Sequence, residues 1–446
     1  MKEFNVLYCP IGVPTFHLES AQKAFEESVK LIKSLDPFAT VPNEMLLTID
    51  ALHKFIEDKN PDLVIVQNVT FANSTYSTEI FKAFNSKFLL WTLREPVIDG
   101  GRLRLNSLTG AFSAGNAFYN MKDDNLLYMF GSPEELEIQT RLAKVIKAGK
   151  VKQAMNSMNL LMIGHTPQGF GFGRALDLEM AKNFGVNLLA IESRELTNLA
   201  KNLKEEQAAE AKKTAESRMV DLDKTLQKNR IDFFKLYSVY KKYIDDNNVL
   251  AIASRCWPDF FTDYGTPVCG VLGMLNQDGI AAACEADAYG ALSMFIGMQL
   301  SGKATYFGDP VSLDESENTI TFWHCGTGAC SLARKDTGAL TGVHPNRKIG
   351  PTMEFGLRPS EKATVFRIGR KADGTFRFLL LKGEILDKPK QFLGTSLVFK
   401  TEPEVKPLVT QLVKDGWEPH YIVIYDDCVE ELEILAEMLN IEICKY

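Results

Sequence analysis

Two carboxylates and one histidine lie within forty residues of each other, each at or just after the end of an apolar run. They are Glu285 in Cys-Glu-Ala-Asp, Asp309 in Phe-Gly-Asp-Pro and His324 in Trp-His-Cys-Gly. The apolar runs are typical of short strands, over residues 280–284, 304–307 and 319–323. Strand ends gather at the rim of a sheet, where ligands bind. Two carboxylates and an imidazole suit a divalent ion, so the pattern predicts part of a site for Mn²⁺, Co²⁺ or Mg²⁺.

Each of these residues also has a purely structural interpretation. Asp287 is an acceptable helix N-cap, which leaves Glu285 free to point into a crevice. Asp309 directly precedes Pro310 and fits an Asp-Pro turn. His324 stands in an apolar run, where a histidine is often part of the core. Their grouping at strand ends favours a site over three separate structural roles.

A later histidine is a further candidate ligand. His420, in Gly-Trp-Glu-Pro-His, directly precedes the apolar run 421–425 and so lies at another element boundary. His344 and His165 are weaker competitors.

The elements before this region alternate between strand and helix. Apolar runs at 4–8, 62–67, 88–92 and 125–130 alternate with helical patterns at 19–35, 42–57, 77–85 and from 133 to about 150. This alternation predicts a Rossmann-like parallel α/β domain over residues 1–157. The pattern restarts with strands at 160–164 and 186–192, one or two long helices over 195–246, and a strand at 249–253. We therefore predict a second Rossmann-like parallel α/β domain over residues 158–318, carrying the metal-ligand carboxylates.

The last part of the chain has a different pattern. Strands over 320–324, 362–370, 375–384 and 395–399 follow one another with turns and no helices between them. Helices at 405–415 and 428–439 flank a strand at 421–425. Residues 319–446 are therefore predicted to form an antiparallel β-barrel-like domain with closing helices.

The composition is that of an ordinary globular protein. The 446 residues are 45% hydrophobic and 24% charged, a length that predicts two or three domains. The net charge of -7 without a long basic stripe argues against a nucleic-acid partner. The first ten residues have neither the apolar stretch nor the cleavage site of a signal peptide, and no run approaches the ~20 apolar residues that a membrane span needs. We therefore expect a cytoplasmic protein that has no membrane partner.

Two other patterns in the sequence, one of cysteines and one of glycines, bear on metal and cofactor binding. Eight cysteines are scattered without a Cys-x-x-Cys pair, which predicts reduced thiols and no structural zinc. Gly169, Gly171 and Gly173 lie between a strand and a helix, but Arg174 stands where a dinucleotide fingerprint needs glycine. A loop shaped for close packing or for a sugar-sized ligand is favoured over a nicotinamide site.

Taken together, the motifs resemble a known family. The order Glu in Cys-Glu-Ala-Asp, Asp in Phe-Gly-Asp-Pro, His in Trp-His-Cys-Gly and a late His in Gly-Trp-x-Pro-His is similar to the L-fucose and L-arabinose isomerase superfamily. Residues 276–328 and the last forty residues carry the resemblance most clearly, and segments 62–71 and 89–96 less specifically.

The resemblance implies a metal-dependent aldose–ketose isomerase that acts on an open-chain monosaccharide through a cis-enediol(ate). Glu285, Asp309 and His420 would hold Mn²⁺, with Co²⁺ or Mg²⁺ as alternatives, and Glu285 and Asp309 would be the catalytic acid/base pair. His324 would bind the metal or orient the substrate. Trp257 resembles a family aromatic near the sugar, and its alternative is a buried core position.

Substrate and assembly are less constrained by the motifs. L-Fucose, D-arabinose and L-arabinose are the default substrates. A C6-sulfonated hexose such as sulfoquinovose is a further possible substrate, because the loops contain cations that would bind an anionic group. These cations are Arg94, Arg102, Arg104, Arg174 and Arg347. Arg255 would contact a polar group of the substrate or pair with a carboxylate. The resemblance also implies a homotrimer or homohexamer.

Two other functions are compatible with the same residues. One is a non-catalytic two-lobed sugar-binding or regulatory protein that uses the same crevice. The other is an NAD(P)-dependent oxidoreductase.

Overall fold

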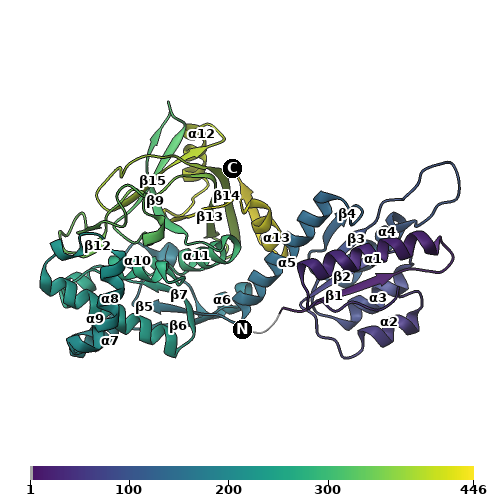
Figure 1. Cartoon of the computed structure of the whole chain (residues 1–446), viewed down its shortest axis with the longest axis horizontal. Helices are drawn as coiled ribbons and strands as arrows, with labels where there is room; N and C mark the ends of the chain where they lie inside the picture. Colours follow the sequence, from purple (N-terminus) through teal and green to yellow (C-terminus); the bar gives the residue numbers. More distant parts are fainter. Residues whose placement is uncertain (1–3) are drawn as a thin grey trace. The chain divides into compact units, whose positions relative to one another are not determined.

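The structure is a computed structural model that describes residues 4–446. These residues form two compact units (Figure 1). The first unit contains the chain up to Ala154 together with Glu430–Asn440, and the second contains Met155–Val429 with Ile441–Tyr446. The three predicted domain ranges stay predictions, and residues 1–3 of the first range lie outside the described part. No helix within residues 4–446 is long and apolar enough to cross a membrane.

The first unit is built on a four-stranded parallel sheet in the order β1-β2-β3-β4. Its strands are β1 (Val6–Ile11), β2 (Leu63–Asn68), β3 (Lys87–Thr92) and β4 (Leu127–Phe130). Its helices are α1 (Leu18–Leu35), α2 (Ile49–Ile56), α3 (Ser74–Ala83), α4 (Ser107–Met121) and α5 (Leu136–Asn156), joined by α13 (Val429–Leu439). Residues Leu7, Cys9 and Ile11 of β1 share one core with α2, α3 and α4. On the opposite face Tyr8 stacks on Phe25 of α1 at 6.3 Å. The predicted parallel α/β fold is confirmed here.

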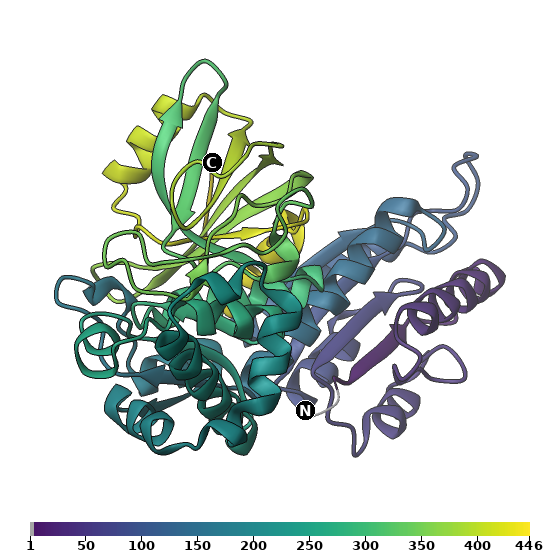
Figure 2. The same cartoon turned by 60° about the vertical axis from the view of Figure 1, so that its left-hand side comes forward.

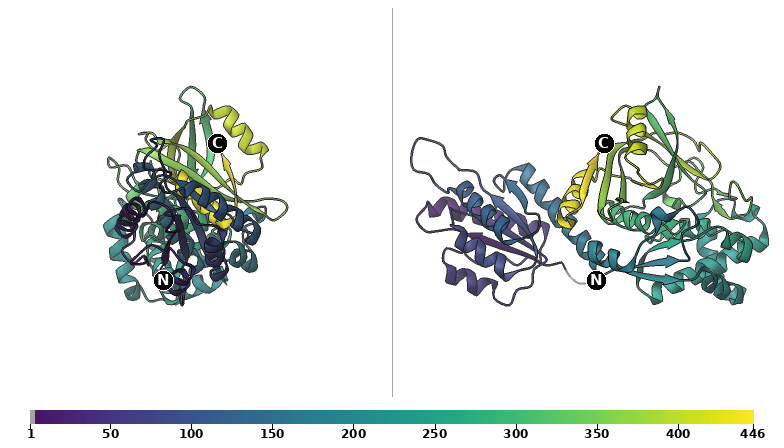
Figure 3. Two further views of the ribbon diagram at one scale, coloured as in Figure 1. Left: turned by 90° about the vertical axis from the view of Figure 1, so that its right-hand side faces the viewer. Right: turned by 180° about the vertical axis from the view of Figure 1, so that it is seen from behind.

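Helix α13 returns to this unit from the far end of the sequence, beside α5 (Figure 3). Glu430 forms ion pairs with Arg141 and Lys144, and Glu431 pairs with Lys147 at 3.5 Å. The second of the two closing helices predicted from the sequence is therefore present, and its residues from Glu430 group with the first unit.

One predicted helix of this unit begins later than expected. The pattern predicted a helix over 42–57, whereas α2 begins at Ile49 with Thr48 as its N-cap. The chain before it runs along the free edge of β1, where Thr40 and Leu46 form parallel bridges with Leu7 and Ile11. These bridges satisfy backbone groups of an edge strand and so hold the segment extended.

The second unit begins with another four-stranded parallel sheet, in the order β6-β5-β7-β8. Its strands are β5 (Asn159–Ile163), β6 (Asn187–Ile191), β7 (Val249–Ser254) and β8 (Ala281–Cys284). From β5 the chain first moves outward to β6 and then returns to β7 on the other side of β5. A crevice for a ligand forms at the carboxyl ends of strands where connections diverge in this way. The sheet thus places the segments after β5, β7 and β8 at one rim.

The helices of this sheet include one clear difference from the sequence prediction. They are α6 (Asp177–Phe184), α7 (Ser193–Asn202), α8 (Ala209–Arg218), α9 (Gln227–Asp246), α10 (Cys269–Gln277) and α11 (Ala288–Ser301). The segment 195–246 was predicted as one or two long helices but forms three. Val220 forms a parallel bridge with Leu340, and Asp221 takes a left-handed backbone with φ of 60°. This long-range bridge draws the chain out of the helix, which local propensity does not report.

The remaining strands of the second unit form a closed antiparallel barrel. They are β9 (Tyr306–Asp314), β10 (Thr319–His324), β13 (Ser360–Arg370), β14 (Phe376–Ile385), β15 (Thr395–Thr401) and β16 (Tyr421–Ile424). The order is β13-β16-β9-β10-β15-β14, and pairing between β13 and β14 closes the ring. Strand β17 (Glu442–Lys445) adds to β14 in parallel, and β11 (Thr341–Gly342) pairs with β12 (Thr352–Met353) as a separate ribbon. The predicted C-terminal β-barrel is confirmed.

Helix α11 links the parallel sheet to the barrel (Figures 1 and 2). It contacts β5, β7 and β8 on one side and β9, β13 and β16 on the other. A helix that is apolar all round must be buried, and twelve of its residues are. The residues just before α11 therefore lie where the rim of the sheet meets the barrel.

Candidate active site

The rim of the parallel sheet supplies the first site residues. Glu285 directly follows β8 and, with Ala286, has a left-handed backbone, φ of 58° and 55°. Such conformations are costly for residues with a Cβ and persist where the surrounding structure enforces them, often at functional sites. Trp257 lies three residues beyond β7, and its Nε1–H donates to Glu285 Oε1 at 3.2 Å. The sheet thus brings these two predicted residues together.

The barrel supplies the others through the ladder β16-β9-β10. Tyr421 is paired with Gly308, and Trp323 is paired with Asp309. Because these pairs are neighbours in the ladder, His420, Asp309 and His324 come to one end of three adjacent strands.

One part of this placement differs from the prediction. Asp309 was expected just after a strand ending at residue 307, but it lies inside β9, which continues to Asp314. Strand β9 pairs with β16 only over Tyr306–Gly308, so Pro310 faces β10 alone and its missing N–H leaves no bond unmade on the other side. Pro310 therefore does not end the strand, although the sequence pattern predicted that the strand stops before it.

The other three predicted donor residues, Glu285, Asp309 and His324, lie around His420. Its Nε2 lies 2.8 Å from Glu285 Oε2 and 3.5 Å from Asp309 Oδ1. Donor atoms of Glu285, His324 and His420 all lie within 4.8 Å of one another. Both histidines are 1% exposed. A set of carboxylate oxygens and imidazole nitrogens this close together fits a divalent ion such as Mn²⁺ or Co²⁺.

Asp287 and Arg367 support His420 from behind, and sequence reasoning missed this role. Asp287 accepts from the backbone N–H of Gly290 at 2.9 Å, as the predicted N-cap. Its Oδ2 also lies 2.9 Å from His420 Nδ1, and both its oxygens accept from the buried Arg367 guanidinium, at 2.6 and 3.1 Å. A carboxylate on Nδ1 orients the ring and leaves Nε2 facing Glu285. The available signal was Arg367 itself, a charged residue in the apolar stretch Thr-Val-Phe-Arg-Ile.

The two site carboxylates are in different electrostatic states. Burial disfavours the charged form of Glu285, but its hydrogen bond with His420 and the charges of His420 and His324 outweigh burial and lower its pKa. Burial dominates at Asp309 and raises its pKa, although both histidines oppose this. Environments that push the pKa values of two carboxyl groups apart are typical of an acid and a base working together.

The surroundings of the two histidines raise the pKa of each imidazole. Burial disfavours the imidazolium of His420, yet hydrogen bonds to Asp287 and Glu285 and the charge of Asp309 raise its pKa to about 10. At His324 burial is likewise outweighed, by the charge and hydrogen bond of Cys325 and by Asp309 and Glu285, and its pKa rises to about 9. The cluster of acids therefore favours a positive charge at this point, whether that of a proton or of a metal ion.

Aromatic rings surround the cluster. Phe307 lies 4.5 Å from the ring centre of His420, and Phe172 lies 5.2 Å from it. Phe170 packs edge-on against Trp257 at 5.8 Å. The glycine loop around residues 169–173 therefore borders this site. A Cβ at Gly173 would lie 2.8 Å from Asp287, whereas Gly169 and Gly171 face open space.

The predicted cations lie in varied surroundings. Arg255 forms an ion pair with Asp259 at 3.0 Å and donates to the carbonyl of His165 at the same rim. Arg174 is exposed and donates to Thr166 Oγ1 at 3.3 Å. The other arginines considered for an anionic substrate are engaged as follows: Arg94 with Glu135, Arg104 with Asp99, Arg102 with the carbonyl of Thr15, and Arg347 over the ring of Phe261. Substrate contacts of His324, Trp257 and Arg255 stay predictions.

The chain is similar over its full length to several proteins of known function. The chain is 58% identical over 442 residues to the sulfoquinovose isomerase of Clostridium sp. (strain MSTE9), covering 99% of both chains. It is 37% identical to the sulfoquinovose isomerase of Priestia megaterium, over 100% of both chains, and 36% identical to that of Alkalicoccus urumqiensis, over 98% of both. No family model matches the chain. Full-length identity at this level, with the predicted site residues gathered at one point, shows an enzyme that interconverts an aldose and a ketose: the chain belongs to the sulfoquinovose isomerase family.

Proposed function

We propose that this protein is a divalent-metal-dependent isomerase that converts sulfoquinovose to the corresponding 2-ketose through a cis-enediol(ate). The observation that supports the proposal is the convergence of the half-buried Glu285 and Asp309 on the buried His324 and His420. The names of the full-length relatives support the sulfonated sugar. The motif order and the combination of parallel sheets with a barrel support membership of the L-fucose and L-arabinose isomerase superfamily.

The proposed metal ligands are Glu285, Asp309 and His420, with Mn²⁺ as the first candidate and Co²⁺ or Mg²⁺ as alternatives. His324 either completes the ligand set or orients the open-chain substrate, since its ring lies within reach of the same point. A bound divalent ion supplies Lewis-acid stabilisation of the negative charge that develops on the substrate oxygens.

The two carboxylates would move the proton between C1 and C2. Glu285, whose pKa is lowered, is ionised at neutral pH and is suited to accept the proton from carbon. Asp309, whose pKa is raised, is the more readily protonated partner and is suited to return a proton to the intermediate. Trp257 holds Glu285 through its indole N–H and limits the motion of the base.

The substrate would lie against Trp257 and the aromatic loop, with its anionic end toward the cations of the same unit. Arg255 directly follows β7, and Arg174 lies in the loop that follows β5, at the rim of the sheet. A guanidinium binds a sulfonate through paired hydrogen bonds. This placement would distinguish a C6-sulfonated hexose from L-fucose, D-arabinose or L-arabinose.

The proposal is tested by isomerisation assays on the metal-free and reloaded enzyme. We expect EDTA to abolish activity on sulfoquinovose and Mn²⁺ to restore it, with weaker turnover of glucose and of the three unsulfonated default sugars. Equal turnover without metal would contradict the metal centre. A preference for an unsulfonated sugar would contradict the substrate while leaving the isomerase centre intact.

The role of Arg255 has its own control. The variant Arg255→Gln should raise the KM for sulfoquinovose more than the KM for glucose, because only the former has an anionic group to lose contact with. Arg94→Gln, which breaks a surface pair with Glu135, should leave the ratio of the two KM values unchanged.

A further inference from the structure

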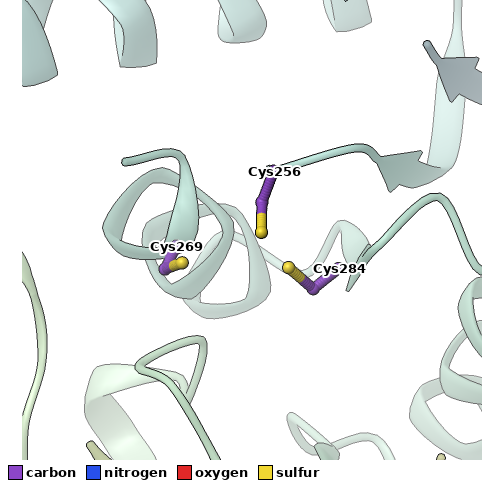
Figure 4. A group of neighbouring side chains, drawn as sticks. All are labelled: Cys256, Cys269 and Cys284. Carbon is purple, nitrogen blue, oxygen red and sulfur yellow. The ribbon is translucent and has the colours of Figure 1, made fainter. Parts of the chain in front are cut away.

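Three buried cysteines converge beside the candidate active site (Figure 4). Cys256 lies two residues beyond β7, Cys269 is the first residue of α10, and Cys284 is the last residue of β8. All three are 0% exposed, and their sulfur atoms lie within 4.8 Å of one another. Figure 4 shows the three Sγ atoms turned toward a common centre, from three separate segments of backbone.

This arrangement has the dimensions of a thiolate metal site. A zinc ion bound at about 2.3 Å by tetrahedral thiolates sets its sulfur atoms about 3.8 Å apart. Side chains that already lie within 4.8 Å need to close by about an ångström or less to reach that geometry. Thiolates select soft or borderline ions, whereas the carboxylate and imidazole donors around His420 suit harder ones.

A fourth sulfur, that of Cys325, lies near one of the three cysteines, Cys269, and would have to move toward the other two to share an ion with them. Cys325 directly follows His324, is half-buried, and has its Sγ within 4.8 Å of Cys269 Sγ. His344 is close to the same pair but is a poor ligand, because its Nδ1 accepts the backbone N–H groups of Asn346 and Arg347 at 3.3 Å. With Nδ1 acting as an acceptor, the ring proton of the neutral imidazole lies on Nε2 and blocks a metal there.

We propose that Cys256, Cys269 and Cys284, with Cys325 as fourth ligand, form a second metal site for a thiophilic divalent ion of the zinc class. All four sulfurs bind the ion as thiolates, so every ligand that is still a thiol loses its proton to solvent as the ion binds, with no change in oxidation state. The sequence alone predicted no structural zinc, because the spacings 256, 269 and 284 match no zinc motif and the ligands meet only in the fold.

The proposed site has a structural consequence for the neighbouring centre. Cys256 directly precedes Trp257, Cys284 directly precedes Glu285, and Cys325 directly follows His324. An ion held by these sulfurs would fix the backbone on which the isomerase residues stand. The ion at the thiol site would stabilise the backbone beside the catalytic cluster. It would bind independently of the metal ion that the reaction uses.

Cadmium binding to the full-length, reduced and metal-free protein tests this inference. Cd²⁺ bound by thiolates absorbs in the ultraviolet and has a strongly deshielded ¹¹³Cd resonance, whereas Cd²⁺ bound by oxygen and nitrogen shows neither feature. We expect one sulfur-bound Cd²⁺ per chain, and we expect Cd²⁺ to displace Zn²⁺ that is already bound at the same site. Absence of a multi-sulfur signal in the wild-type protein at stoichiometric Cd²⁺ would overturn the proposal, without any variant that has to fold.

Single substitutions then assign the ligands. Cys256→Ser, Cys269→Ser and Cys284→Ser should each abolish the sulfur signal, and Cys325→Ser should retain it with weaker binding. Cys9→Ser is the matched control, since Cys9 is equally buried but lies in the core of the first unit, and it should bind Cd²⁺ as the wild type does. A sulfur signal that persists in all three primary variants would place the ion elsewhere and contradict the assignment.

Discussion

Glu285 is the residue on which the proposed chemistry depends most. Its carboxylate contacts both His420 and Trp257, and its left-handed backbone aims it into the cluster. Glu285→Gln keeps the size of the side chain but removes the base, so we expect turnover to fall about 10²–10⁴-fold. The isomerisation rate measures this, with circular dichroism to confirm folding. Normal turnover would refute the assignment, and Glu179→Gln, which breaks a surface pair with Arg370, should keep near-normal activity.

The raised pKa of His420 predicts how metal binding depends on pH. A folded-state pKa of about 10 means that the metal-free protein gains stability from this proton below the ordinary histidine pKa of about 6.5 and loses it as the pH rises toward 10. A metal ion needs the neutral ring and must displace the proton. The affinity for Mn²⁺ should therefore rise about tenfold per pH unit between pH 6 and 8, as measured by calorimetry. An affinity independent of pH would show that His420 is not a ligand.

At the scale of elements, the pair Arg367–Asp287 ties strand β13 to the turn that precedes α11. Asp287→Asn should weaken Mn²⁺ binding about 10–100-fold, because His420 loses the carboxylate that orients it. The same change leaves Arg367 buried without its partner charge and should destabilise the metal-free fold by about 3–5 kcal/mol in urea unfolding.

A double variant separates these two effects. Adding Arg367→Met to Asp287→Asn removes the uncompensated charge, so it should recover part of the stability while metal binding stays weak. Recovery of both properties would mean that Asp287 supports the fold and has no role at His420.

Local sequence patterns predicted the strands and the site residues at their ends. They did not predict the contacts between distant segments that hold these residues in place. The apolar runs before Glu285 and after His420 each predicted a strand that the structure contains, because burial on both faces leaves a continuous apolar signature. The interior position of Asp309 depended on which side of β9 is paired, which no local pattern contains. The contact between Asp287 and Arg367 spans eighty residues and forms only when the barrel packs on α11.

At the scale of the whole molecule, the family resemblance predicts an assembly. We expect size-exclusion chromatography with light scattering to give a mass of three or six times the 49.9 kDa chain. A monomer with full isomerase activity would contradict the expected homotrimer or homohexamer and would show that one chain completes the site.

The central claim is that the cluster around His420 moves a proton between two carbons of a sulfonated aldose with the help of a divalent ion. The most direct measurement is to incubate the Mn²⁺-loaded protein with sulfoquinovose in D₂O and to analyse sugars by mass spectrometry and NMR. The account predicts formation of the ketose, incorporation of solvent deuterium at carbon, and loss of both with EDTA or in Glu285→Gln. Conversion that proceeds in the presence of EDTA, or in Glu285→Gln at the wild-type rate, would contradict it.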